Sequence, residues 1–96
     1  TLFIGVVHGN EPGGKPLLQH LCWFLRAHPE ILEDKTVVVI PVANPDGLAR
    51  GTRYNAHNID INRNFPTGNW AKNRRKKDKT RGPASEPETM AIMKAL

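Results

Sequence analysis

The chain has 96 residues, which allows one domain at most, and a formal net charge of +5. Its single cysteine, Cys22, excludes both an internal disulfide and a cysteine-cluster metal site. No apolar run approaches the roughly 20 residues that a membrane-spanning helix needs, so we expect no membrane span.

The positive charge is concentrated in one stretch of the chain. Residues 71–82 contain seven of the fourteen Lys and Arg residues and one acidic residue, whereas the rest of the chain has seven basic and eight acidic residues. Long-range attraction to a polyanion needs a broad positive face, which this distribution does not provide. We therefore expect residues 71–82 to form a solvated basic loop and the chain to bind no nucleic acid specifically.

The first half of the chain predicts a parallel strand–helix–strand unit. Residues 2–7 form a continuous apolar run, the pattern of a strand that is covered on both faces in a parallel sheet. Apolar residues then recur with helical spacing over residues 17–25, and Pro29 ends that helix. Residues 36–40 are all β-branched and predict a second strand. We therefore expect an α/β fold with a parallel-type sheet and flanking helices.

The second half of the chain is less regular. Residues 44–47, with the sequence NPDG, predict a turn, and residues 48–82 show no sustained periodicity. A stretch of that length is usually functional or disordered. Ser85 and Glu88 have the spacing of a capping box, and with Pro87 between them they predict the start of a C-terminal helix.

His8 and Glu11 are the first candidate functional residues. His8 follows the first predicted strand, and ligands of parallel α/β units gather beyond the carboxyl ends of the strands. A neutral imidazole and a carboxylate are ordinary zinc ligands, and a catalytic zinc takes three protein ligands and a water. The pair supplies two of those three ligands, although the same two residues are also compatible with a solvated turn.

The turn after His8 offers one competing interpretation. Residues 9–15 match the core pattern of a phosphate-binding loop, G-x-x-x-x-G-K, between a strand and a helix. However, Pro12 has no backbone N–H to offer a phosphate, and Glu11 would place a carboxylate against it. Pro16 also stands where a hydroxyl group would hold magnesium. Nucleotide binding is therefore a minor alternative.

A second candidate cluster, residues 50–66, is rich in arginine and asparagine and follows the second predicted strand at the same edge of the sheet. An arginine side chain matches a carboxylate bidentately, and a neighbouring asparagine adds a further donor. Asn62 and Arg63 are therefore suited to hold the terminal carboxylate of a ligand. Any single arginine in such a stretch is also compatible with a solvent-facing charge.

Taken together, these blocks resemble the zinc carboxypeptidases in order and spacing. The compact spacing between Arg53 and Asn62 is similar to that of the murein-peptide amidase branch and of the related aspartoacylase-like enzymes. The resemblance implies a phosphorylase/hydrolase-like α/β fold, with residues 1–96 forming an incomplete, N-terminal part of the catalytic domain. The blocks that carry it are HGNE at residues 8–11, NPDG at 44–47, DINRNF at 60–65 and SEPET at 85–89.

The resemblance also implies a role for five residues. His8 and Glu11 would be the first two ligands of one zinc ion. Arg53 would stabilise the oxyanion beside the scissile carbonyl, and Asn62 and Arg63 would hold the free carboxylate of a peptide or murein-peptide substrate. The implied activity is that of a zinc metallocarboxypeptidase or peptide amidase. The third ligand, a histidine, and the general base, a glutamate, would lie on later strands, so the chain alone is expected to be inactive.

Two other functions are compatible with the same residues. An aspartoacylase-like amidohydrolase of N-acyl amino acids would share the zinc and arginine groups. A non-catalytic module would instead bind an anionic polymer through residues 71–82, without zinc. A histidine and a glutamate downstream of residue 96 would favour an enzyme. The sequence predicts neither the compartment nor the side-chain preference.

The remaining polar residues are expected to be structural. Asp60 is expected to brace its loop by local hydrogen bonds and not to act as a base. His20 is expected within the first helix, His28 at the end of that helix and His57 in the arginine-rich loop, each without a ligand role. Cys22 is expected to be a small buried apolar residue. Glu86 and Glu88 are expected at the N-terminus of the last helix, where the helix dipole favours them.

Overall fold

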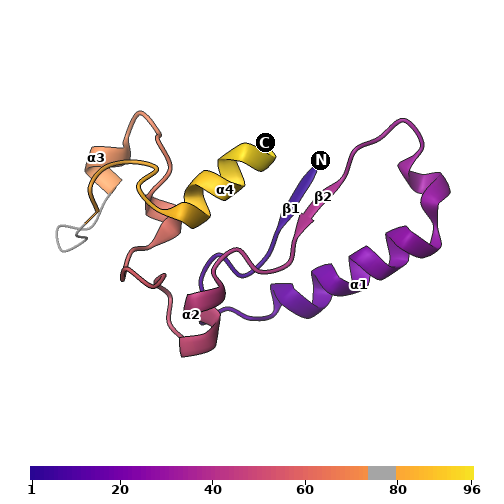
Figure 1. The fold of residues 1–96 in the computed structure, drawn as a ribbon, viewed down its shortest axis with the longest axis horizontal. Coiled ribbons are helices and arrows are strands. Elements are labelled where there is room, and N and C mark those ends of the chain that lie inside the picture. Colours follow the sequence, from indigo (N-terminus) through magenta and orange to yellow (C-terminus); the bar gives the residue numbers. More distant parts are fainter. Residues whose placement is uncertain (74–79) are drawn as a thin grey trace.

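The computed structural model describes residues 1–73 and 80–96. Figure 1 shows helix α1 running alongside two strands, with α2, α3 and α4 gathered toward the other end of the molecule. The chain is therefore α/β, as expected. The elements in chain order are β1 (Leu2–Ile4), α1 (Gly14–Ala27), the 3₁₀ turn η1 (Pro29–Leu32), β2 (Val38–Ile40), α2 (Pro45–Arg50), the 3₁₀ turn η2 (Ile61–Arg63), α3 (Trp70–Asn73) and α4 (Pro87–Ala95).

The two strands pair in parallel, which confirms the strand–helix–strand prediction. Leu2 lies opposite Val38, and Ile4 lies opposite Ile40. The hydrogen-bonded ladder continues past the strands, because the backbone N–H of Asn44 donates to the carbonyl oxygen of Val6 at 3.0 Å. The carboxyl ends of both strands therefore remain side by side up to the residues that follow them.

The first strand is shorter and more exposed than the apolar run predicts. The strand ends at Ile4, and Phe3 is 41% exposed, so residues 2–7 are not covered on both faces. Val6 has a φ of 48°, which lies in the left-handed region and is strained for a β-branched side chain. This backbone turn ends the regular strand and redirects the chain toward His8.

Helix α1 confirms the predicted helical periodicity, although its apolar face is only partly covered. Leu18 is buried, whereas Leu17 and Trp23 are 69% and 62% exposed. Cys22 is a half-buried free thiol, which is less buried than expected. His20 and His28 are exposed, on the helix and at its C-terminal end, as expected.

The predicted turn at residues 44–47 is the beginning of a helix. The side chain of Asn44 accepts a hydrogen bond from the backbone N–H of Gly47 at 2.9 Å and caps α2, with Pro45 in its first turn. Gly51, with a φ of 63°, ends α2 in the left-handed conformation. Helix α2, the turn η2 and helix α3 all include residues between 48 and 82. The prediction that this stretch lacks regular structure is therefore wrong for these three elements.

The predicted C-terminal helix is present, but the predicted capping box is not. Helix α4 has Pro87 in its first turn, and the residue at the N-cap position is Glu86, without a capping hydrogen bond from its side chain. The hydroxyl of Ser85 instead donates to Oε1 of Glu86 at 2.7 Å. The serine is therefore used to hold a carboxylate and not to cap the helix.

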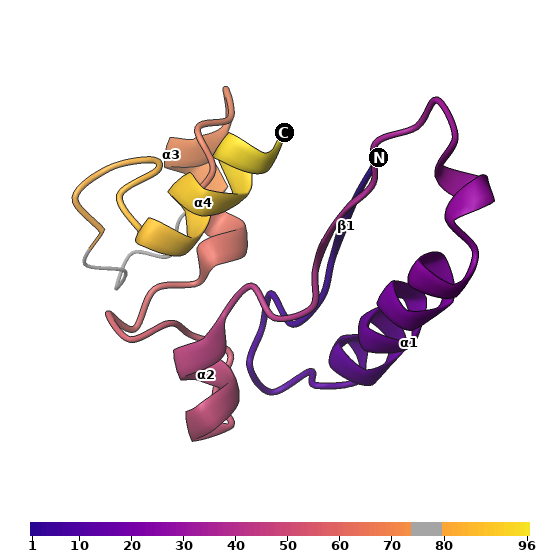
Figure 2. The same ribbon diagram turned by 45° about the vertical axis from the view of Figure 1, so that its right-hand side comes forward.

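The buried centre of the molecule lies where the carboxyl ends of the strands meet η2 and α4. Its apolar part consists of Ala43, Ile61 and Ile92, with Val7, Ile40 and Phe65 packed against it. Figure 2 shows the strands between α1 on one side and α4 on the other. Polar side chains contribute as much to this centre as apolar ones, and they are His8, Asn44, Asn55, Asp60, Asn64, Glu86 and Thr89.

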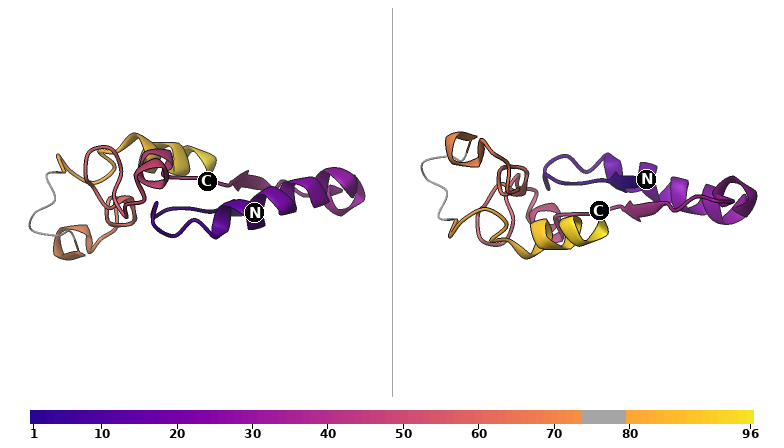
Figure 3. Two further views of the ribbon diagram at one scale, coloured as in Figure 1. Left: turned by 90° about the horizontal axis from the view of Figure 1, so that it is seen from below. Right: turned by 90° about the horizontal axis from the view of Figure 1, so that it is seen from above.

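The molecule is elongated and thin. It measures 47 × 29 × 17 Å and has a radius of gyration of 15.0 Å, compared with about 13 Å for a compact chain of this length. Figure 3 shows the thin profile from two sides. Within residues 1–73 and 80–96, no helix has the length and apolar character that crossing a bilayer requires.

The basic segment is only partly described by the structure. Lys72, in α3, and Arg81 are both exposed, as expected of solvated charges. The prediction of a loop over residues 71–82 is wrong for the first of them, because α3 extends to Asn73, and for residues 74–79 it lies outside the described residues.

Candidate functional site

The turn that carries His8 and Glu11 is fixed by close backbone packing. The backbone N–H of Glu11 donates to the carbonyl oxygen of His8 at 3.1 Å, which closes the turn. Gly9 lies directly against the backbone of Gly47, and a Cβ atom at Gly9 would overlap it. The turn after the first strand therefore packs against α2 through two glycines.

Asn44 connects this turn to the arginine-rich segment. Besides capping α2, its side-chain amide donates to the carbonyl oxygen of Val7 at 3.3 Å and to that of Arg53 at 3.4 Å. Asn44 itself is fully buried. The backbone next to His8 and the backbone of Arg53 are thus held by one side chain.

Asp60 is the residue around which the site is organised. It is fully buried, and its Oδ1 lies 3.1 Å from Nε2 of His8. Its Oδ2 accepts a hydrogen bond from Nε of Arg53 at 2.8 Å, and its Oδ1 also accepts one from the backbone N–H of Asn62. The local bracing predicted for Asp60 is confirmed. Its contacts with the side chains of His8 and Arg53 were not predicted, and His8 is 52 residues away in the chain.

The environment of Asp60 keeps its carboxyl group ionised. Burial raises the pKa of this carboxyl, but the hydrogen bond and charge of Arg53, followed by those of His8, outweigh burial and lower the pKa below its ordinary value of 3.8. A carboxylate at this position can only accept hydrogen bonds. It therefore requires a proton on Nε2 of His8.

That proton leaves the other nitrogen of His8 available. In the neutral imidazole with a proton on Nε2, the lone pair is on Nδ1. Nδ1 lies 3.4 Å from Oε2 of Glu11, whose side chain is 66% exposed. The other oxygen of Glu11 is 4.0 Å from Nη1 of Arg53. Three of the predicted site residues, His8, Glu11 and Arg53, therefore lie together.

Asn62 and Arg63 lie at the margin of this cluster. They form η2 with Ile61, which is completely buried and holds the turn in the core. Both side chains are exposed, and the guanidinium of Arg63 donates to the carbonyl oxygen of Asn62 at 3.1 Å. Their link to the cluster is the hydrogen bond from the backbone of Asn62 to Asp60. Asn62 and Arg63 are thus accessible to a ligand.

His57 and Glu86, which were expected to have no ligand role, contact each other. Nδ1 of His57 lies 2.6 Å from Oε2 of Glu86, so His57 faces the N-terminus of α4. Glu86 is buried and is held by several side chains, which is more than the expected interaction with the helix dipole. Within residues 1–73 and 80–96, no group of three or more His, Cys, Asp or Glu side chains is arranged to hold a metal ion.

The chain is similar to known proteins over most of its length. The family model described as zinc carboxypeptidase matches residues 1–96. Murein peptide amidase A of Escherichia coli K12 is 32% identical over 99% of this chain and 43% of its own length. Carboxypeptidase Z of Homo sapiens is 34% identical over 95% of this chain and 19% of its own length.

A solved structure is similar as well. The crystal structure of the murein-tripeptide amidase of Escherichia coli O157 matches with a TM-score of 0.65 and 26% identity, over 98% of this chain and 43% of that one. The present chain therefore spans less than half the length of these relatives.

Proposed function

The chain belongs to the zinc carboxypeptidase family, and on that basis we propose that it forms part of the active site of a zinc-dependent peptidase or peptide amidase. In this proposal the substrate is a peptide that carries a free carboxylate near the bond to be cleaved. His8 and Glu11 are zinc ligands, Arg53 is a catalytic residue, and Asn62 and Arg63 bind the substrate carboxylate.

The observation that carries the proposal is the position of Asp60 between His8 and Arg53. One buried carboxylate accepts hydrogen bonds from a candidate metal ligand and from a candidate oxyanion-stabilising residue. Histidine ligands of zinc commonly donate their second N–H to a carboxylate, which fixes the ring and raises its basicity. A purely structural salt bridge between Asp60 and Arg53 would not require the histidine.

The donor atoms of His8 and Glu11 fit zinc in type and in separation. Two ligand atoms at about 2.1 Å from a tetrahedral ion lie roughly 3.4 Å from each other. The distance between Nδ1 of His8 and Oε2 of Glu11 is 3.4 Å. When bound, zinc polarises a substrate carbonyl and lowers the pKa of its bound water toward about 7. A third ligand and a general base must be supplied from outside the described residues.

The arginines have different tasks in this proposal. Arg53 is 28% exposed in its side chain, and its Nε is bound to Asp60, which leaves its terminal nitrogens facing the side of Glu11. From there it can donate to the oxygen of the scissile carbonyl as negative charge develops on it. Arg63 presents an exposed planar guanidinium that matches a carboxylate bidentately and orients the substrate.

The compared proteins support a peptide substrate. They are named as carboxypeptidases and as murein peptide amidases, and the solved structure is of a murein-tripeptide amidase. We therefore prefer a peptide or a murein peptide to the N-acyl amino acid of an aspartoacylase-like enzyme. The alternative of an anion-binding module rests mainly on residues 74–79, which lie outside the described residues.

Steady-state kinetics of the full-length protein test the role of each arginine. With an N-blocked dipeptide that has a free carboxylate, Arg63→Ala should mainly raise KM, because its contact is made in both the ground state and the transition state. Arg53→Ala should lower kcat by about 100-fold or more, because the oxyanion exists only during the reaction. Activity should disappear with a zinc chelator and return with added zinc. Full activity of His8→Ala would contradict the proposal.

A further inference from the structure

The segment from Asn55 to Asn64 carries Asp60, Asn62 and Arg63, yet it contains little regular structure. Its one regular element is the short turn η2. Short irregular segments lose conformational entropy when they are ordered, so their geometry must be held by specific contacts. Both ends of this segment are attached to the same region, the residues at the N-terminus of α4.

Asn55 closes the first half of the segment into a loop. Its Oδ1 accepts hydrogen bonds from the backbone N–H of His57 at 3.1 Å and from that of Ile59 at 2.9 Å. Its own backbone N–H donates to the carbonyl oxygen of Ile59 at 2.9 Å. Asn58 takes a left-handed conformation, with a φ of 62°, inside this loop. The loop lies between Arg53 and Asp60 in the chain and therefore sets their separation.

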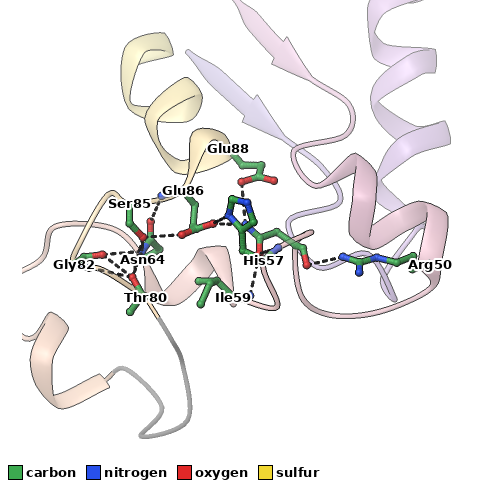
Figure 4. A network of polar contacts seen from close by, with 10 residues as sticks. Arg50, His57, Ile59, Asn64, Thr80, Gly82, Ser85, Glu86 and Glu88 are labelled. Atoms are coloured by element: carbon green, nitrogen blue, oxygen red, sulfur yellow. Dashed lines mark hydrogen bonds and ion pairs between the residues drawn. The ribbon is translucent and has the colours of Figure 1, made fainter.

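The carboxylate of Glu86 attaches this loop to α4. Oε2 of Glu86 accepts a hydrogen bond from the side-chain amide of Asn55 at 2.8 Å, and Nδ1 of His57 lies 2.6 Å from the same oxygen. Oε1 of Glu86 accepts from the hydroxyl of Ser85 at 2.7 Å. Figure 4 shows Glu86 between His57 and Ser85 in this network.

The second end of the segment is held by Asn64, which directly follows Arg63. Oδ1 of Asn64 accepts from the backbone N–H of Glu86 at 3.1 Å, and its amide donates to the hydroxyl of Ser85 at 3.1 Å. Asn64 is fully buried and Glu86 is 4% exposed. The side chain of Glu86 thus binds one end of the segment, and its backbone binds the other.

The hydrogen bonds of Glu86 indicate that its side chain supports the structure and does not bind a ligand. A cavity of about 400 Å³ borders it, lined by His57, Ile59, Arg81, Ser85 and Glu86. Both carboxylate oxygens of Glu86, however, already accept hydrogen bonds from the protein. Burial raises the pKa of this carboxyl, but hydrogen bonds from Ser85, Asn55 and His57 outweigh burial and lower it below the ordinary value of 4.5.

We propose that Glu86 is a positioning residue, which holds the segment of residues 55–64 so that Arg53 and Arg63 are correctly placed for a substrate. The inference rests on the proposed peptidase function. Neither Asn55 nor Glu86 reaches the zinc-binding pair, so the effect on catalysis is transmitted through the loop backbone. A displacement of about 1 Å in such a segment is enough to lower a rate by roughly 100-fold.

The test combines hydrogen exchange with kinetics in the full-length protein. Glu86→Ala should increase backbone exchange at residues 55–64 by about tenfold or more, with α1 unchanged. It should also raise KM by about tenfold and lower kcat by a similar factor. Loss of folded protein alone would lower the apparent kcat and leave KM unchanged. Glu86→Gln, which keeps an acceptor for Asn55, should remain within about threefold of the wild type.

Two further variants make each outcome decisive. Glu33→Ala removes an exposed glutamate in the connection after η1 and should change neither exchange nor kinetics. Glu86→Asp keeps the charge but withdraws the carboxylate by one methylene, and it should raise KM several-fold. This variant tests the positioning role if the alanine variant does not fold. Unchanged KM and unchanged exchange at residues 55–64 in the folded Ala or Asp variant would overturn the proposal. An inactive wild type with increased loop exchange in Glu86→Ala would refute the peptidase function alone.

Discussion

At the scale of single residues, Asp60 has more partners than any local role requires. It neutralises Arg53, caps η2 through the backbone of Asn62, and orients His8. A buried carboxylate with three donors is stable in its ionised form because each oxygen is satisfied. Removing its charge should therefore affect the proposed zinc ligand His8 and the side chain of Arg53 together.

Asp60→Asn should weaken zinc binding by about 10- to 100-fold, because the amide cannot accept from both His8 and Arg53 in their present geometry. Competition with a chromophoric zinc chelator measures the affinity in the full-length protein. The matched control is Asp34→Asn, since Asp34 is exposed and its φ of 58° suits asparagine. Equal zinc affinities of Asp60→Asn and Asp34→Asn would show that Asp60 does not support the ligand.

At the scale of elements, the contact between two glycines joins the first βα turn to α2. A Cβ atom at Gly9 would overlap the backbone of Gly47 and of Leu48, neither of which is the flexible end of a side chain. The HGNE and NPDG blocks are therefore adjacent in space, and their contact requires a glycine at position 9. A Cβ atom at Gly47 would instead meet the side chain of Asn44 and the carbonyl oxygen of Tyr54. The contact between the two blocks could not be predicted from either block alone.

Gly9→Ala should destabilise the protein by about 1–3 kcal/mol and weaken zinc binding, because the backbone must move to relieve the overlap. Denaturant unfolding followed by circular dichroism measures the stability. Gly13→Ala is the matched control, since a Cβ atom there would meet nothing within 4 Å. An equal, small change in stability for both substitutions would contradict the close packing of Gly9 against Gly47.

The interaction between the 55–64 segment and α4 should depend on pH through Glu86. The pKa of this carboxyl is lowered in the folded protein, so its contribution to stability is fully present above the unfolded value near 4.5. That contribution is lost as the pH falls through the lower pKa of the folded state. Between pH 6 and pH 3, the melting temperature of the wild type should therefore fall further than that of Glu86→Gln.

Thermal unfolding at several pH values checks this prediction. Glu33→Gln serves as the control because Glu33 is exposed and should follow the wild type at every pH. Parallel curves for Glu86→Gln and the wild type across this range would mean that Glu86 is not stabilised in its ionised form.

At the scale of the whole molecule, the sequence predicted four of the elements in their chain order and the edge of the sheet where the candidate site lies. Apolar runs and helical spacing identified β1, α1, β2 and α4, because these signals are local. The length of β1 was overestimated, since the left-handed backbone of Val6 leaves no trace in an apolar run. Helix α2 was missed because N-P-x-G is compatible with both a turn and a capped helix start.

The site was predicted less completely than the fold. His8, Glu11 and Arg53 were identified from residue type and position, and the structure brings them together. The partnerships of Asp60 with His8 and of Asn55 with Glu86 span 52 and 31 residues, and no local spacing reports contacts of that range. The runs of asparagine and acidic residues in the four sequence blocks were the available signal, because such residues are seldom buried without specific partners.

The central claim is that His8 and Glu11 are zinc ligands, and metal analysis of the full-length protein tests it most directly. After dialysis against a zinc buffer, the wild type should retain about one zinc ion per chain, and His57→Ala should retain as much because His57 faces Glu86. His8→Ala and Glu11→Ala should each retain less than about a tenth of that amount. Retention of one zinc ion by both of these variants, or its loss in His57→Ala, would contradict the account.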